Sequence, residues 1–218
     1  MGFIKFWCTI IHQLSSDKNM MRYLTILSTI LLCNMSFAKV PEKIAICSSC
    51  HGIDGQASQT LYPNLAGQSA KYLCKQLIDY KNKQRSSEIM QVYANLLTNE
   101  DIEEIAVYYS KLPIKISKKD TKSTPQSSLK TTETLFKVGD YARRIPACSA
   151  CHAINGRGND PAKYPSLAGQ NPDYTIQQLY AFKKQLRQND PKQIMQNISQ
   201  RLSKKDIQLL AEYIHQLD

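Results

Sequence analysis

Two short segments of the chain share one pattern of thiols and imidazole. They read Cys47-Ser48-Ser49-Cys50-His51 and Cys148-Ser149-Ala150-Cys151-His152. In the pattern CxxCH, two thiols reach the two vinyl groups of one porphyrin, and the imidazole of the next residue reaches its iron. The two copies therefore predict two covalently bound c-type haems, each anchored by its two cysteines and bound at the iron by its histidine.

The residue that fills the second axial position decides what each iron can do. Four of the six methionines fall in a predicted leader: Met1, Met20, Met21 and Met35. The other two, Met90 and Met195, each stand eight residues before a hydroxyl residue predicted to cap a helix. A thioether favours ferrous iron, raises the reduction potential and closes the coordination sphere. We therefore predict no catalytic residue and four metal ligands: His51, Met90, His152 and Met195.

Other side chains have weaker claims to a role. His215 faces a serine when the two halves are aligned, which favours a surface residue over a ligand. Cys74 faces an isoleucine, which favours a buried thiol that packs as a small hydrophobe. Arg85 and Arg187 recur at matching positions, and two interpretations stay open for them: fork donors to haem propionates, or solvated arginines.

Two other uses of paired cysteines fit the sequence less well. A zinc site made by two CxxC pairs has a short connection, whereas 97 residues separate Cys50 from Cys148. A thioredoxin-like motif requires strands in a βαβ setting, and no segment alternates as a strand. Neither use explains the adjacent histidines or the paired methionines.

The chain after residue 38 is one unit written twice. The matching segments are 47–55 with 148–156, 62–68 with 164–170, and 90–112 with 195–217. The second pair reads Tyr-Pro-Asn-Leu-Ala-Gly-Gln and Tyr-Pro-Ser-Leu-Ala-Gly-Gln. The offset drifts only from 101 to 105, which indicates a duplication with insertions in loops.

Apolar residues recur at helical spacing within each unit, so we predict an all-α fold. The segment from Tyr72 to Tyr80 presents one apolar face, and so does the segment from Ile102 to Leu112. The last helix of each unit follows a capping-box pattern, Thr98 to Asp101 and Ser203 to Asp206.

The predicted domains are two tandem haem units joined by a linker. The boundaries are a leader or signal peptide at 1–38, an N-terminal domain at 39–112, a linker at 113–131 and a C-terminal domain at 132–218. The linker is rich in Lys, Ser and Thr and has no apolar periodicity. Units of this size form a marginal protein core, so we expect the haem to supply much of it.

The N-terminus has the layout of a secretory signal. Met20-Met21-Arg22 precedes an apolar run from Leu24 to Cys33, and Ser36-Phe37-Ala38 resembles a cleavage site. We expect translation to start at Met20 or Met21; an uncleaved anchor and a lipoprotein site at Cys33 are weaker alternatives. Export to the periplasm also suits the thiols, because c-type haem is attached on the oxidising side of the membrane.

The chain is basic, with 28 Lys and Arg against 18 Asp and Glu. Removal of the leader, with Lys5, Lys18, Arg22 and Asp17, leaves a formal charge of +8. A basic surface suits an acidic protein partner or an anionic membrane surface. We find no nucleic-acid motif, so we expect redox proteins as partners and leave open a loose association with the membrane.

Taken together, these residues resemble the dihaem cytochrome c4 family, which is built from two class I cytochrome c domains. The resemblance covers residues 39–218 and implies a periplasmic electron carrier whose haem propionates meet near the domain boundary. It also implies that Pro63 and Pro165 accept hydrogen bonds from the outer ring nitrogens of the ligand histidines. Two features depart from the family: little sequence precedes Cys47, and Ala153 stands where Gly52 does.

The expected function is electron transfer with one electron per haem. The resemblance implies a quinol-oxidising complex or a dehydrogenase as donor and a terminal oxidase as acceptor. One alternative is the cytochrome subunit of a flavin-containing sulfide dehydrogenase. A dihaem peroxidase would need an iron without a strong sixth ligand, and a purely structural module would need to be stable without haem.

Overall fold

The structure, a computed structural model, describes residues 42–116 and 126–217. Both described ranges belong to one compact unit. We call residues 42–116 the first repeat and residues 126–217 the second repeat. The predictions about the leader, its start codon and its cleavage lie outside the described residues.

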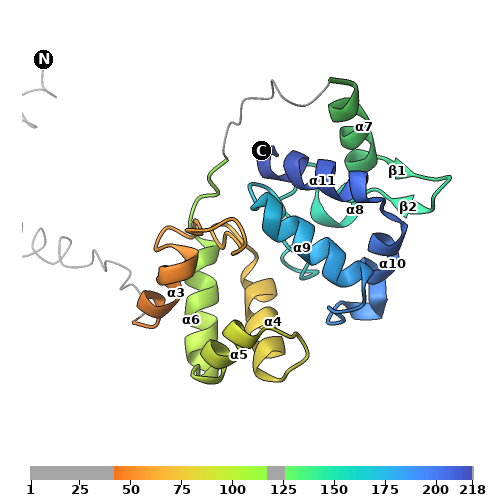
Figure 1. The fold of residues 1–218 in the computed structure, drawn as a ribbon. Coiled ribbons are helices and arrows are strands. Elements are labelled where there is room, and N and C mark those ends of the chain that lie inside the picture. The colour runs from red at the N-terminus through yellow and green to blue at the C-terminus, as the bar shows by residue number, and fades with distance from the viewer. Residues whose placement is uncertain (1–41, 117–125, 218) are drawn as a thin grey trace, which may run out of the picture. The chain divides into compact units, whose positions relative to one another are not determined.

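The first repeat consists of four helices, which Figure 1 shows in orange to green. They are α3 (Ile44–His51), α4 (Ala70–Lys81), α5 (Glu88–Asn95) and α6 (Asn99–Ser110). Helix α4 packs against both α5 and α6. The predicted faces lie on α4 and α6, so the helical periodicity located both helices correctly.

The second repeat has four counterparts of these helices, preceded by an additional one. The counterparts are α8 (Ser149–His152), α9 (Pro172–Lys183), α10 (Ile194–Arg201) and α11 (Lys204–Gln216). The additional helix is α7 (Gln126–Lys137), which packs against α11. A 3₁₀ turn, η2 (Pro191–Gln193), leads into α10 between the matching segments 164–170 and 195–217.

Two details differ from the sequence-based expectation. Helix α7 begins at Gln126, so the last residues of the predicted linker at 113–131 are helical. A two-stranded antiparallel pairing, β1 (Gly139–Asp140) with β2 (Ile145–Pro146), occurs where no strand was predicted. Both strands are only two residues long, which is too short for an alternating pattern, and the fold remains essentially all-α.

Each repeat has its own hydrophobic core. The first core contains Ile44, Leu73, Leu97, Ile102, Ile105, Ala106 and Tyr109. The second contains Leu135, Phe136, Ile145, Leu202, Ile207, Leu210, Ile214 and Leu217. Neither core includes a residue of the other repeat, as expected for two folding units derived from a duplication.

Both last helices begin with the predicted capping box. The Thr98 hydroxyl accepts from the N–H of Asp101 at 3.1 Å, and the Asp101 carboxylate accepts from the N–H of Thr98 at 2.9 Å. Ser203 and Asp206 make the same pair of bonds at 3.1 and 2.8 Å. These bonds satisfy backbone donors that the helix itself leaves free, and they fix the entry of α6 and α11.

The turn after each ligand histidine requires a left-handed backbone. Gly52 has a φ of 72°, and Ala153 at the matching position has a φ of 64°. With ψ values of 147° and 159°, both residues lie in a region that glycine adopts freely, whereas a residue with a Cβ carries a cost of roughly 1–3 kcal/mol. The departure noted in the sequence therefore leaves the chain path unchanged and strains the second turn.

Two serines close together near the end of the second repeat predict opposite effects on stability. The Ser203 hydroxyl caps α11, so Ser203→Ala should lower the free energy of unfolding by about 1 kcal/mol. The hydroxyl of Ser199 is fully buried in α10 without a hydrogen-bond partner, so Ser199→Ala should be neutral or stabilise by up to about 1 kcal/mol. Denaturant unfolding of the haem-loaded protein measures both; a loss at Ser199 equal to that at Ser203 would contradict this assignment.

Candidate functional site

Each histidine of the two CxxCH motifs ends a helix and is held by a proline carbonyl. His51 is the last residue of α3, and its Nδ1 lies 3.0 Å from the carbonyl oxygen of Pro63. His152 is the last residue of α8, and its Nδ1 lies 2.9 Å from the carbonyl oxygen of Pro165. These are the two prolines that the family resemblance assigned to this role, and that expectation is confirmed.

This hydrogen bond determines which ring nitrogen is available to a metal. A carbonyl oxygen can only accept, so the proton of each ring sits on Nδ1, and Nε2 keeps its lone pair. Both rings are 7% exposed, and burial lowers the pKa of His51 and of His152, although the proline carbonyls oppose that shift. Each imidazole is therefore neutral, oriented and suited to donate to iron.

The four motif cysteines are free thiols and half-buried. Burial raises the pKa of Cys47 above its ordinary value, and it raises the pKa of Cys148 to about 11. A thiol pair that exchanges with disulfides needs a lowered pKa in at least one member. The shifts at Cys47 and Cys148 are opposite to the one that activates a thiol for exchange.

The predicted methionine ligands occupy corresponding places in the first turns of α5 and α10. The N–H of Met90 donates to the hydroxyl of Ser87, which caps α5, at 3.2 Å. Met195 is the second residue of α10. Both side chains are half-buried. The helix starts thus place one thioether in each repeat, on a different element from the histidine.

The donor set fits haem c better than it fits zinc. Each repeat presents two unpaired thiols one helical turn apart and a neutral imidazole with a free Nε2. Within residues 42–116 and 126–217, no three His, Cys, Asp or Glu side chains come together to hold a metal ion. A zinc site built from the cysteine pairs would need four such ligands in one place.

The two recurring arginines are buried, which excludes the interpretation as solvated residues. Arg85 is 5% exposed and donates to Gln76, Tyr174 and Gln178 at 2.8–2.9 Å. Arg187 is 7% exposed and donates to Tyr72, Gln76, Gln178 and Asn189. In the described part of the chain, no carboxylate forms a salt bridge with either guanidinium.

Buried guanidinium groups of this kind are suited to bind an anion. The pKa of Arg85 is raised above its ordinary value even though burial opposes the charge, so the side chain stays a cation. A buried cation normally requires a partner of opposite charge. Amide and hydroxyl oxygens already accept from both guanidinium groups, so their pairing with haem propionates stays a prediction.

Two further sequence interpretations can be compared with the structure. His215 is half-buried rather than free on the surface, and its Nδ1 lies 3.1 Å from the carbonyl oxygen of Gln170. Cys74 is half-buried against the first core, as expected for a small hydrophobe. Burial is the first cause that raises the pKa of its thiol.

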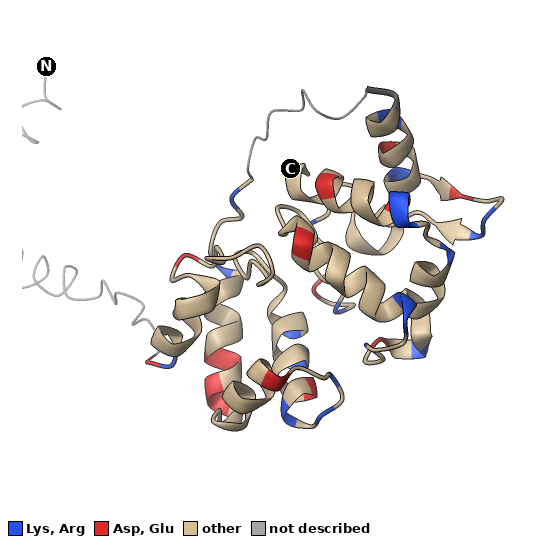
Figure 2. Ribbon diagram, viewed as in Figure 1, with Lys and Arg blue, Asp and Glu red and all other residues tan. Residues whose placement is uncertain are grey.

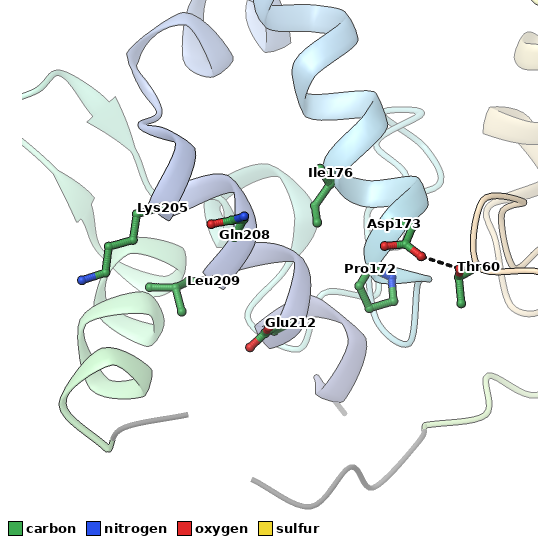
Figure 3. A pocket seen from close by; sticks show the side chains of 8 residues that line it. All are labelled: Thr60, Pro172, Asp173, Ile176, Lys205, Gln208, Leu209 and Glu212. Carbon is green, nitrogen blue, oxygen red and sulfur yellow. Dashed lines mark hydrogen bonds between the residues drawn. The ribbon is translucent and has the colours of Figure 1, made fainter. Parts of the chain in front are cut away.

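A surface groove of about 540 Å³ lies away from these residues. Figure 3 shows that it is lined by side chains of α9 and α11, with Thr60 of the first repeat at one end bonded to Asp173. None of its lining residues is a predicted ligand of haem or iron.

Comparison with known proteins agrees with this geometry. The cytochrome c family model matches residues 43–113 and 140–218, one match per repeat. The chain belongs to the cytochrome c family. Among curated relatives, cytochrome c4 of Stutzerimonas stutzeri is 37% identical over 80% of this chain and 86% of its own length. The cytochrome c4 resemblance is thus confirmed.

Solved structures and a second kind of relative add detail. A crystal structure of reduced recombinant cytochrome c4 from Pseudomonas stutzeri matches with a TM-score of 0.75 and 38% identity, over 81% of this chain and 95% of that chain. A thiosulfate dehydrogenase electron acceptor from Stutzerimonas stutzeri is 34% identical over 77% of this chain and 76% of its length. Membership in this family makes the chain a haem c electron carrier and not an enzyme.

Sequence reasoning missed a set of buried and half-buried glutamines between the repeats. Gln68 and Gln170 each hydrogen bond to the backbone of the other repeat, and Gln76 and Gln178 join the arginine network. The available signal was that each glutamine recurs at the matching position of both repeats although it is polar. Helical periodicity looks for apolar residues and therefore gave these positions no role.

The thiol chemistry predicts how the purified protein responds to alkylation. After denaturation, the four motif cysteines should resist a thiol reagent because thioether bonds block them, whereas Cys74 should be alkylated. Peptide mass spectrometry identifies the modified positions, and Cys74→Ser is the control that should remove this modification. Alkylation of Cys47, Cys50, Cys148 or Cys151 in haem-containing protein would contradict covalent attachment.

Proposed function

We propose that the chain carries two covalently bound haems, one per repeat, and transfers one electron per haem between exported redox proteins. The carrying observation is that both repeats contain the same donor set: two thiols, an oriented neutral imidazole and one methionine. His51 and Met90 would bind one iron, and His152 and Met195 the other. The haem supplies the redox change, while these residues fix its position and its potential.

The ligand pair favours a carrier over a peroxidase. A peroxidase needs an open or weakly filled position at one iron, where peroxide can bind. Each repeat here offers a methionine in the first turn of the corresponding helix, α5 or α10. With both axial positions filled by protein, each iron can change oxidation state but has no place for a substrate.

We propose a periplasmic location, with the leader at 1–38 as the export signal. The oxidising side of the membrane is where free cysteine pairs would otherwise form disulfides and where haem attachment to them is expected. Within the described residues, no helix has the length and apolar character needed to cross a membrane. A loose association with the membrane surface through basic residues is compatible with this proposal.

The distribution of charge suggests which repeat meets an acidic partner. The first repeat carries eight basic and eight acidic residues, and the second carries thirteen basic and seven acidic. Figure 2 shows acidic residues gathered at the start of α6, whereas basic residues are spread over several elements of the second repeat. Opposite charges steer association, so we propose that an acidic redox partner docks on the second repeat.

We propose a dehydrogenase as the electron donor. One relative is described as the electron acceptor of a thiosulfate dehydrogenase, which favours a dehydrogenase as donor. The alternative donors are a quinol-oxidising complex and a flavin-containing sulfide dehydrogenase, with a terminal oxidase as acceptor. Reduction by each purified donor in a stopped-flow instrument ranks them, and failure of every donor to reduce the protein would contradict the role of carrier.

Replacement of each methionine tests the proposed ligands. Met90→Ala should lower the reduction potential of the first haem on the order of 0.1 V. The reason is that the iron loses the thioether ligand, which favours the ferrous state. Met195→Ala should do the same to the second haem. A redox titration measures both potentials, and the absorption spectrum of each oxidised variant should lose about half of the methionine-to-iron charge-transfer band. Cys74→Ser is the control that should leave both potentials unchanged.

Neutral replacement of exposed lysines tests the proposed docking side. Lys163 precedes Tyr164, whose ring lies 6.3 Å from that of His152, and Lys192 lies three residues before Met195. The variant Lys163→Gln/Lys192→Gln should reduce the second-order rate with an acidic acceptor several-fold and weaken its salt dependence. Lys111→Gln in the first repeat is the matched control; an equal loss of rate in that control would overturn the assignment.

A further inference from the structure

Gln68 and Gln170 connect each repeat to the backbone beside the other repeat's histidine anchor. The Oε1 of Gln170 accepts from the N–H of Asn64 at 2.8 Å, and its Nε2 donates to the carbonyl of Asn64 at 2.9 Å. Gln68 makes the same two bonds to Ser166, also at 2.8 and 2.9 Å. Both glutamine side chains are buried, so water does not compete for these bonds.

Each of these contacts ends on a peptide group that also binds a predicted iron ligand. The carbonyl of the Pro63–Asn64 peptide accepts from Nδ1 of His51, while the N–H of the same peptide donates to Gln170. In the second repeat, the Pro165–Ser166 peptide binds His152 through its carbonyl and Gln68 through its N–H. One planar group therefore joins each histidine to a glutamine of the other repeat.

Hydrogen bonds at the two ends of a peptide group strengthen each other. A peptide whose N–H donates becomes a better acceptor at its carbonyl oxygen, by about 10–30% per bond, because its dipole is polarised. A stronger acceptor draws the Nδ1 proton and makes the imidazole a better electron donor at Nε2. A better donor stabilises ferric iron, so the reduction potential falls.

We propose that Gln68 and Gln170 are positioning residues that tune the potential of the haem in the opposite repeat. Gln170 acts on the first haem through the Pro63–Asn64 peptide, and Gln68 acts on the second haem through the Pro165–Ser166 peptide. This inference rests on the proposed His/Met haem function. It adds that contact between the repeats helps to set both reduction potentials. Each potential is lower when the two repeats are in contact than when they are separated.

A purely structural role for the glutamines makes a different prediction. If they only hold the repeats together, the loss of either one should resemble the loss of any other bond between the repeats. Thr60 provides that comparison, because its hydroxyl donates to Asp173 across the repeats and touches neither proline peptide. Thr60→Val is therefore the control for weakened contact alone.

The decisive experiment is a redox titration of the haem-loaded variants Gln170→Met, Gln68→Met and Thr60→Val. Methionine keeps the approximate length of glutamine and removes both hydrogen-bonding groups. Gln170→Met should raise the reduction equilibrium constant of the first haem roughly three- to tenfold, and tenfold corresponds to 59 mV for a one-electron couple. Gln68→Met should raise the potential of the second haem in the same way. Thr60→Val should change neither potential.

A spectroscopic signal separates tuning from general loosening. In the reduced, diamagnetic protein, Gln170→Met should move the NMR signal of the Nδ1 proton of His51 upfield and leave that of His152 in place. Gln68→Met should do the reverse. Equal shifts at both haems, a shift confined to the haem of the mutated repeat, or an effect matched by Thr60→Val would overturn the proposal.

The outcome is distinguishable from failure of the proposed function. A haem content below two per chain, or high-spin iron in the unmodified protein, would count against the His/Met carrier and not against the glutamines alone. If the methionine variants fail to fold, Gln170→Glu and Gln68→Glu replace them. Glutamate keeps the oxygen that accepts from the peptide N–H and gives it a negative charge. Each should lower the potential of the opposite haem more than that of its own, and the reverse order would refute the proposal.

Discussion

The hydrogen bond from the Nδ1 of each histidine to a proline carbonyl is the contact on which the account of the site depends. It places the proton on Nδ1, leaves Nε2 free and fixes the plane of each ring at the end of α3 or α8. Burial favours the neutral imidazoles, and the residue that follows each histidine, Gly52 or Ala153, has a positive φ. The rest of each repeat supports this one orientation.

The two repeats keep separate apolar cores but share a polar boundary. Arg85 and Arg187 donate hydrogen bonds to glutamines and tyrosines of both repeats. Gln68 and Gln170 reach across to the peptides beside the histidine anchors. Polar contacts of this kind depend on exact geometry and satisfy each other only when the repeats are in register. In a duplicated electron carrier, these contacts fix the position of each repeat against the polar side chains of the other.

Much of the site could be predicted from the sequence because its chemistry is local. CxxCH fixes two thiols and an imidazole within five residues, the capping boxes at Thr98 and Ser203 locate the last helices, and the duplication identifies Met90 and Met195. The glutamine contacts could not be predicted in this way, since they depend on which surfaces of the two repeats meet. The start of α7 at Gln126 was missed because the first residues of that helix are polar, and the arginines gave no sign of their burial.

The central claim is that each iron is bound by one histidine and one methionine. Iron X-ray absorption of the oxidised, haem-loaded protein measures this most directly, because the cysteine sulfurs of haem c do not touch the metal and only a methionine would add a sulfur to the first coordination shell. Ligation of both irons by histidine and methionine gives an average of one sulfur and five nitrogens per iron. A shell without sulfur, or with half a sulfur per iron, would contradict it.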